Sequence, residues 1–171
     1  MSSVDPGRVV DARRERYGRS YDDLTPGDVY RHWPGKTITE ADDHLFCLLT
    51  MATSPLHIDA AHANREMEKG RNIVVGALVY SLLVGMSLVD VTGQAVAALG
   101  VDELRHVAPL FHGDTLYGET SIVAKRRSES RIGMGIVTAE TRGFNQTGEL
   151  VCRFRRSFML PCGAGSNDSP G

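Results

Sequence analysis

One uncharged stretch constrains the fold of this chain more than any other, the seventeen residues from Ile73 to Val89 that read IVVGALVYSLLVGMSLV. It is apolar on nearly every face, and a helix that is hydrophobic all round must be buried. Its length is at the lower end of the membrane-spanning range, but glycine, serine and tyrosine dilute it and long amphipathic segments follow. The stretch therefore predicts a soluble core helix, ~25 Å long at ~1.5 Å per residue. The loop entering its N-terminus is the natural place for a site.

The composition and net charge limit the kinds of protein that this chain can be. The 171 residues are 42% hydrophobic and 23% charged, which is typical of one globular domain with a sizeable core. A net charge of -2 provides no general attraction to nucleic acid or to membranes, so neither is expected as a partner. The N-terminus lacks the apolar core of a signal peptide, and the three cysteines include no CxxC pair. We therefore predict reduced thiols and a cytoplasmic protein.

The segment before the core helix predicts two shorter helices separated by a loop. Thr39 to Asp42 resembles a capping box, and the helix that follows carries one apolar face. Pro55 disfavours a helical conformation at Ser54, so a loop is expected there. Asp59 is placed to cap the next helix. The apolar face of the first helix consists of Ala41, Leu45, Leu48 and Leu49.

After Gly93 the hydrophobic period changes from helical to two, which predicts strands. Arg156 interrupts the alternation in the last strand and indicates a bulge or a subunit contact. One buried helix followed by long antiparallel strands predicts the α+β class, with a curved sheet wrapped around a single helix. The predicted strands are 95–106, 115–127, 131–144 and 150–160.

The same pattern divides the chain into an N-terminal arm at 1–20, one domain at 21–161 and a tail at 162–171. The arm is polar and is expected to be loosely held or docked on a partner subunit. The tail is mostly Gly, Ser, Asn and Pro and is expected to be disordered. Because a single curved sheet leaves a long unpaired edge, we also predict a homodimer.

Five runs over residues 21–160 carry a resemblance to a known family: ITEADDHLF, PLHIDAAHA, GRNIVVGAL, VAPLFHGDTL and GELVCRF. In this order they resemble the MaoC-like hydratases and dehydratases, a family similar to (R)-specific enoyl-CoA hydratases. The resemblance implies a single hotdog domain and a homodimer with its pockets near the subunit interface. It also implies reversible addition of water to a 2-enoyl thioester, giving a 3-hydroxyacyl thioester on coenzyme A or acyl carrier protein.

The reactive loop of that family resembles D-x-N-P-x-H. Pro55 and His57 match its Pro and His, and Gly76 matches the Gly that begins the hotdog helix. The acidic position falls on Ala52, and the Asn position falls on Ser54. The loop therefore keeps the imidazole and lacks the carboxylate that would share the attacking water with it.

The chemistry explains this choice of residues. His57 would take the proton of the water and return one to the α-carbon, and the Gly76 amide at a helix N-terminus would stabilise the enolate-like oxygen. The hydroxyl of Ser54 or Thr53 would orient the water. Pro55 and Val75, which flank these groups, are expected to contact the substrate. A lone His after Pro is otherwise usually structural, and a Gly in an apolar helix can serve close packing alone.

Basic residues supply two candidate contacts to phosphate. Arg126 lies in a Lys-Arg-Arg run near Arg131, and Arg71 precedes the core helix. Either could meet coenzyme A or an acidic carrier protein, although a solvated hairpin end explains the first somewhat better. The histidines show no metal-ligand spacing, so no metal site is expected, and no cofactor is predicted. No Ser or Cys lies in a nucleophile-elbow motif, so no motif supports covalent acyl transfer.

Ala52 leaves three hypotheses for function open. The first is the hydratase or dehydratase described above. The second keeps the thioester pocket for a thioesterase, or for the addition of an amine to an enoyl thioester in a biosynthetic pathway. The third is a catalytically silent or inactivated protein that binds the thioester or completes a partner, with Ala52 either natural or engineered.

Overall fold

The computed structural model describes residues 17–67 and 69–163, and it has the α+β architecture expected from the sequence. The elements follow the order β1 (Val29–Arg31), β2 (Lys36–Thr37), α2 (Glu40–Thr50), α3 (Pro55–Ile58), α4 (Ala60–Glu66), α5 (Gly76–Ser87), the π-helical turn η1 (Leu88–Thr92), β3 (Ala97–His106), β4 (Thr115–Arg127), β5 (Met134–Phe144) and β6 (Leu150–Pro161). The proposed arm and tail lie almost entirely outside the described residues.

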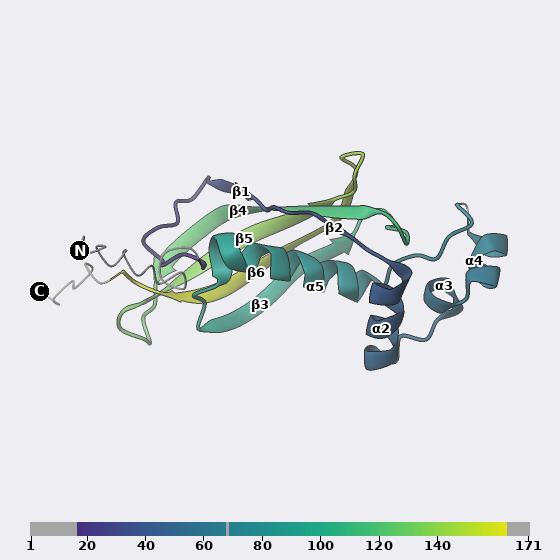
Figure 1. Ribbon diagram of the computed structural model, residues 1–171. Helices are drawn as coiled ribbons and strands as arrows, with labels where there is room; N and C mark the ends of the chain where they lie inside the picture. Colours follow the sequence, from purple (N-terminus) through teal and green to yellow (C-terminus); the bar gives the residue numbers. More distant parts are fainter. Residues whose placement is uncertain (1–16, 68, 164–171) are drawn as a thin grey trace, which may run out of the picture.

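A curved antiparallel sheet packs against α5 (Figure 1). The strand order is β1-β4-β5-β6-β3, and β2 adds to β4. β3 is therefore an edge strand whose outer side has no partner in the described chain. The antiparallel pairing confirms the central prediction from the sequence. The fifth strand begins at Met134 rather than Arg131, because residues 131–133 form the preceding turn.

The core helix and its turn cover residues 76–92, somewhat later than the apolar run itself. Ile73 instead makes a bridge to Phe111, and the Val74 amide donates to the Leu110 carbonyl at 2.7 Å. The start of the apolar run is thus tied to the turn between β3 and β4. Leu83 of α5 is fully buried among side chains of the sheet such as Phe154, as an all-apolar helix requires.

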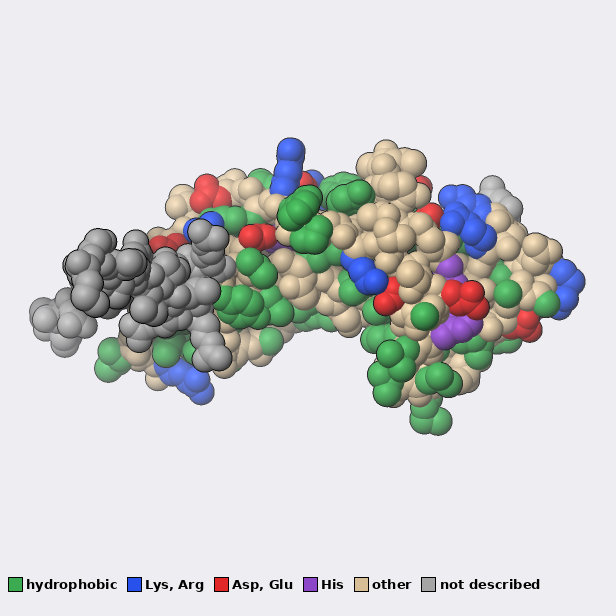
Figure 2. Space-filling view, in the orientation of Figure 1, with side chains coloured by type: hydrophobic (Ala, Val, Ile, Leu, Met, Phe, Trp, Pro, Cys, Tyr) green, Lys and Arg blue, Asp and Glu red, His purple; other side chains and the backbone are tan. Residues whose placement is uncertain are grey.

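The α2 helix begins with the capping box that the sequence predicts, but its apolar face is exposed to solvent. The Thr39 hydroxyl accepts from the Asp42 amide at 3.2 Å, and the Asp42 carboxylate accepts in return from the Thr39 amide at 2.9 Å. Yet Leu48 and Leu49 are 74% and 76% exposed, and Leu45 is exposed beside them. Figure 2 shows the hydrophobic side chains gathered over the lower end of α2.

Arg156 does not mark a bulge between β5 and β6. The register runs without interruption through the pairs that Ala139 and Thr138 make with Arg156 and Ser157. The pairing of β3 with β6 is irregular at two places, between Ala98 and Gly100 and between Asp102 and Arg105 of β3. Arg156 therefore points to the same side of the sheet as the buried Phe154 and Phe158. None of the described helices is long and apolar enough to cross a bilayer.

Candidate active site

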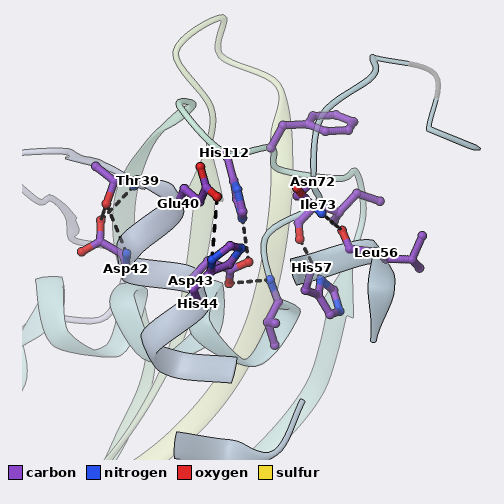
Figure 3. Close-up of polar contacts among 12 residues, drawn as sticks. Thr39, Glu40, Asp42, Asp43, His44, Leu56, His57, Asn72, Ile73 and His112 are labelled. Atoms are coloured by element: carbon purple, nitrogen blue, oxygen red, sulfur yellow. Dashed lines mark hydrogen bonds and ion pairs between the residues drawn. The ribbon is translucent and has the colours of Figure 1, made fainter. Parts of the chain in front are cut away.

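The site is built around α3, the four-residue helix that carries His57. Pro55 stands at its first position, where a missing N–H costs nothing. The residues before α5 hold this helix in place (Figure 3). The buried Asn72 amide donates to the Leu56 carbonyl at 3.0 Å, and the Ile73 amide donates to the same carbonyl at 3.1 Å. The reactive loop is thus tied directly to the entry of the core helix.

His57 has one ring nitrogen engaged and one available. Its Nδ1 lies 2.7 Å from the Ile73 carbonyl oxygen. Because a carbonyl can only accept, Nδ1 carries the proton, and in the neutral ring Nε2 is left with a lone pair. This tautomer is the one a general base requires.

A cavity of about 360 Å³ lies beside His57. Leu56 and His57 of α3, Gly76 of α5, His106 of β3 and Val151 of β6 contribute to its wall. Apart from the two imidazoles, the side chains that line it are apolar. Such a pocket suits an acyl group next to an acid–base residue.

Gly76 opens α5 at the wall of this cavity. A Cβ there would stand 2.7 Å from both Cε1 and Nε2 of His106, so only glycine fits without displacing that ring. The amides before it are occupied, Val74 by Leu110 and Val75 by the Asp43 carboxylate. The Gly76 amide donates to no acceptor within the described residues. It is a free donor at the positive end of a helix.

Asp43 anchors that helix end and was not identified from the sequence. Its carboxylate is fully buried; one oxygen accepts from the Val75 amide at 3.0 Å and the other lies 2.8 Å from Nε2 of His112. The His112 ring in turn contacts His44 edge-on, with centroids 5.7 Å apart. Figure 3 shows this chain of contacts linking α2 to the start of α5. These contacts form only when α2 packs against the start of α5, so no local sequence pattern predicts them.

His106 is the other component that sequence reasoning missed. In the sequence it is a single histidine without metal-ligand spacing, so no motif marks it. The end of β3 brings its ring against Gly76 and into the cavity with His57. Among the described residues, no group of three or more His, Cys, Asp and Glu side chains is placed to hold a metal ion.

The other residues predicted for the site are not among those that line the cavity. Ala52 is half-buried and packs against the main core cluster. Thr53, Ser54 and Pro55 are exposed. Val75 has a buried side chain in the core, and its amide is already bound by Asp43.

The two phosphate candidates are separated by the length of the sheet. Arg71 is near the His57 cavity, where it donates to the His112 carbonyl at 2.8 Å and pairs with Asp114 at 3.2 Å. Arg126 is linked through β5 to Met159 of β6, whereas the cavity meets β6 at Val151. At ~3.3 Å per residue that interval is about 26 Å. Within one chain, Arg126 does not reach the site that contains His57.

Sequence comparison places this chain in a known protein family. Residues 23–143 match the family model described as MaoC like domain. The chain is 30% identical over 143 residues to a mesaconyl-CoA hydratase of Cereibacter sphaeroides, covering 84% of this chain and 41% of that protein. It thus spans less than half the length of the curated relatives it matches.

Solved structures give the same result. The (R)-hydratase of A. caviae involved in PHA biosynthesis is 30% identical, with a TM-score of 0.66 over 81% of this chain and 98% of that one. A Mycobacterium tuberculosis protein with a double hotdog fold is 26% identical, with a TM-score of 0.71 over 90% of this chain and 47% of that one. The chain belongs to the MaoC-like hydratase and dehydratase family and has the hotdog fold.

Proposed function

We propose that this protein is a hydratase or dehydratase of acyl thioesters, acting on a 2-enoyl or 3-hydroxyacyl substrate. The observation that carries the proposal is the pairing of His57 with Gly76. A basic imidazole nitrogen and an unused helix-terminal amide border the same apolar cavity. The names of relatives that hydrate or dehydrate CoA thioesters support this reaction class.

In the hydration direction, the thioester carbonyl accepts from the Gly76 amide while Nε2 of His57 removes a proton from water. The water oxygen bonds to the β-carbon, the double bond shifts, and negative charge gathers on the thioester oxygen. The imidazolium then delivers its proton to the α-carbon. One water is added in all, and His57 returns to its starting state.

The alanine at position 52 affects how the attacking water is oriented. With no carboxylate at that position, water orientation falls to Ser54 and Thr53 of the same loop, or to His106 across the cavity. Loss of the carboxylate also keeps the two other hypotheses, hydrolysis or amine addition and a silent binding subunit, as alternatives. Arg71 is our candidate for the phosphates if the carrier is coenzyme A, because its exposed side chain lies at the same end of the molecule as His57.

We also propose that two copies associate in the cytoplasm. Two features support a homodimer: the outer edge of β3, which pairs with no strand in the described part of the chain, and the exposed leucines of α2. An unpaired edge and an apolar patch both invite a partner. Free thiols support a reducing compartment, and burial raises the pKa of the Cys152 thiol to about 11, which keeps it protonated and unreactive.

The decisive experiment offers the full chain crotonyl-CoA, mesaconyl-CoA and longer 2-enoyl-CoA thioesters. Loss of enoyl absorbance, release of free thiol and product mass are followed separately. We expect the absorbance to fall without thiol release and the product to gain one water. Thiol release would favour hydrolysis, absorbance loss that depends on added amine would favour amine addition, and tight binding without reaction would favour a silent subunit.

A further inference from the structure

A second cavity of about 320 Å³ lies farther along α5, between that helix and the β3 end of the sheet. Its walls are largely apolar and include Tyr80 and Val84 from α5, Leu88 from η1 and Val101 from β3. Among the described residues that line it, one has a charged side chain, Arg156 of β6. We refer to it as the Arg156 cavity.

Arg156 is buried and largely unpartnered. It is 8% exposed, its Nη2 donates to the Ser87 hydroxyl, and its guanidinium carbon lies 5.4 Å from the centre of the Phe158 ring. Its Nε has no hydrogen-bond partner among the residues that the structure describes. Within the described residues no carboxylate forms an ion pair with it, whereas the neighbouring Arg155 pairs with both Glu140 and Glu103.

A charge in such a position is expensive unless something pairs with it. Burial lowers the pKa of Arg156 to about 10, so the guanidinium is still protonated at neutral pH. Packing alone would be served better by methionine or leucine at this inward position. A guanidinium with unused N–H groups is, however, the geometry that binds a carboxylate through two parallel hydrogen bonds.

The Arg156 cavity and the His57 cavity lie along the same strip of the molecule. Gly76 of the His57 cavity and Tyr80 and Val84 of the Arg156 cavity are spaced four residues apart on one row of α5. β3 runs beside both, from His106 at the His57 cavity to Ala98 at the Arg156 cavity. From Gly76 to Ser87, which Arg156 contacts, the helix rises about 16 Å.

We propose that Arg156 binds a carboxylate at the far end of the acyl chain, so that the preferred substrate is the thioester of a long dicarboxylic acid. This inference rests on the proposed function and specifies its substrate class. The thioester lies at Gly76 and His57, the methylene chain follows the apolar row of α5, and the terminal carboxylate meets Arg156. Tyr80, whose ring packs edge-on against Phe154 with centroids 4.8 Å apart, lines the Arg156 cavity about one turn of α5 after Gly76, and the chain passes beside its ring.

The test compares matched thioesters that differ only in the terminal group. The intact protein is given 2-decenoyl-CoA and 2-decenedioyl-CoA, and kcat/KM is measured for each, with shorter dicarboxylic homologues down to mesaconyl-CoA alongside. We expect the long dicarboxylic thioester to be preferred by about 10- to 100-fold, the usual size of a charge-assisted hydrogen-bonded pair. That preference should fade as the chain becomes too short to reach Arg156.

Variants then assign the preference to one side chain. Arg156→Met removes the charge at similar volume and should reduce the ratio of the two kcat/KM values to about one or below, while Arg156→Lys should retain part of it. Arg153→Met is the matched control, because it removes an exposed arginine from the same strand. Melting temperatures establish that each variant is folded, and the wild-type ratio stands as a test even if Arg156→Met does not fold.

Binding separates the two proposals. The saturated thioesters decanoyl-CoA and decanedioyl-CoA cannot be hydrated, and calorimetry reports their affinities directly. Tighter binding of decanedioyl-CoA that Arg156→Met abolishes supports the Arg156 proposal even if no enoyl thioester is hydrated, in which case the proposed function fails alone. Hydration of crotonyl-CoA with no preference for either ten-carbon thioester overturns the Arg156 proposal and leaves the proposed function standing.

Discussion

His57 is the residue whose replacement best separates chemistry from folding. Its ring makes one hydrogen bond to the chain and otherwise faces the cavity, so His57→Ala should lower turnover by roughly 100-fold or more, the usual size of an acid–base contribution. The melting temperature should change little. Steady-state hydration of crotonyl-CoA measures the effect.

His62 supplies the matched control. It lies five residues later on α4 and is half-buried, like His57, but belongs to a different helix. His62→Ala should retain wild-type turnover. Equal activity in the His57 and His62 variants would remove His57 from the mechanism.

Ala52 is the residue at which activity can be gained. Ala52→Asp or Ala52→Asn offers an oxygen to orient the water, and Asp also stabilises the imidazolium of His57, so hydration should rise by roughly 10- to 1000-fold. Because Ala52 packs against the core, the free energy of unfolding is measured in parallel. If both variants fold and bind thioester without faster hydration, Ala52 is not the site of a missing catalytic group.

At the scale of elements, Asp43 determines how α2 holds the start of α5. Asp43→Ala leaves the buried Val75 amide and the His112 ring without their acceptor, which should cost roughly 2–4 kcal/mol in urea unfolding. Asp43→Asn keeps an acceptor for the amide and should cost less. It should also retain more turnover, because the Gly76 amide stays in place. Equal losses in the two variants would show that the hydrogen bond to Val75 contributes nothing.

The cap of α2 makes stability depend on pH in the acid range. Hydrogen bonds from Lys36 and Thr39 lower the pKa of Asp42 from 3.8 to about 2. The stabilisation is therefore complete above pH ~4, where the unfolded carboxyl is ionised, and is lost as the pH falls towards 2. Asp42→Asn should remove this part of the pH dependence. Urea midpoints measured between pH 5 and pH 2.5 for both proteins test it, and parallel curves would contradict the assignment.

At the scale of the whole molecule, light scattering on the full chain should give the mass of a dimer at micromolar concentration. Leu48→Lys places a charge within the exposed apolar face of α2 and should shift the protein towards monomer if that face is covered by the second copy. Ile132→Lys is the control, because Ile132 is fully exposed in the β4–β5 turn. A wild-type monomer, or equal effects of the two substitutions, would count against this interface.

The sequence determined the architecture because its signals there are periodic and local. The uncharged run at 73–89 is apolar on nearly every face and must be buried. The change of hydrophobic period after Gly93 predicts strands for the later segments. The capping box at Thr39 and the Pro–x–His loop are likewise local patterns. They predicted α2 from neighbouring residues alone, and a loop at Pro55 and His57 where the structure has the short helix α3.

Only the tertiary structure decided how those parts meet. Asp43 reaches the Val75 amide, His106 covers Gly76, and Arg156 turns towards a cavity beside α5, each across a long sequence separation. Such contacts depend on how α2, β3 and β6 pack against α5. The type of a single side chain does not predict that packing. The same dependence separates Arg126 from His57: both are polar residues in plausible motifs, but they lie at opposite ends of one sheet.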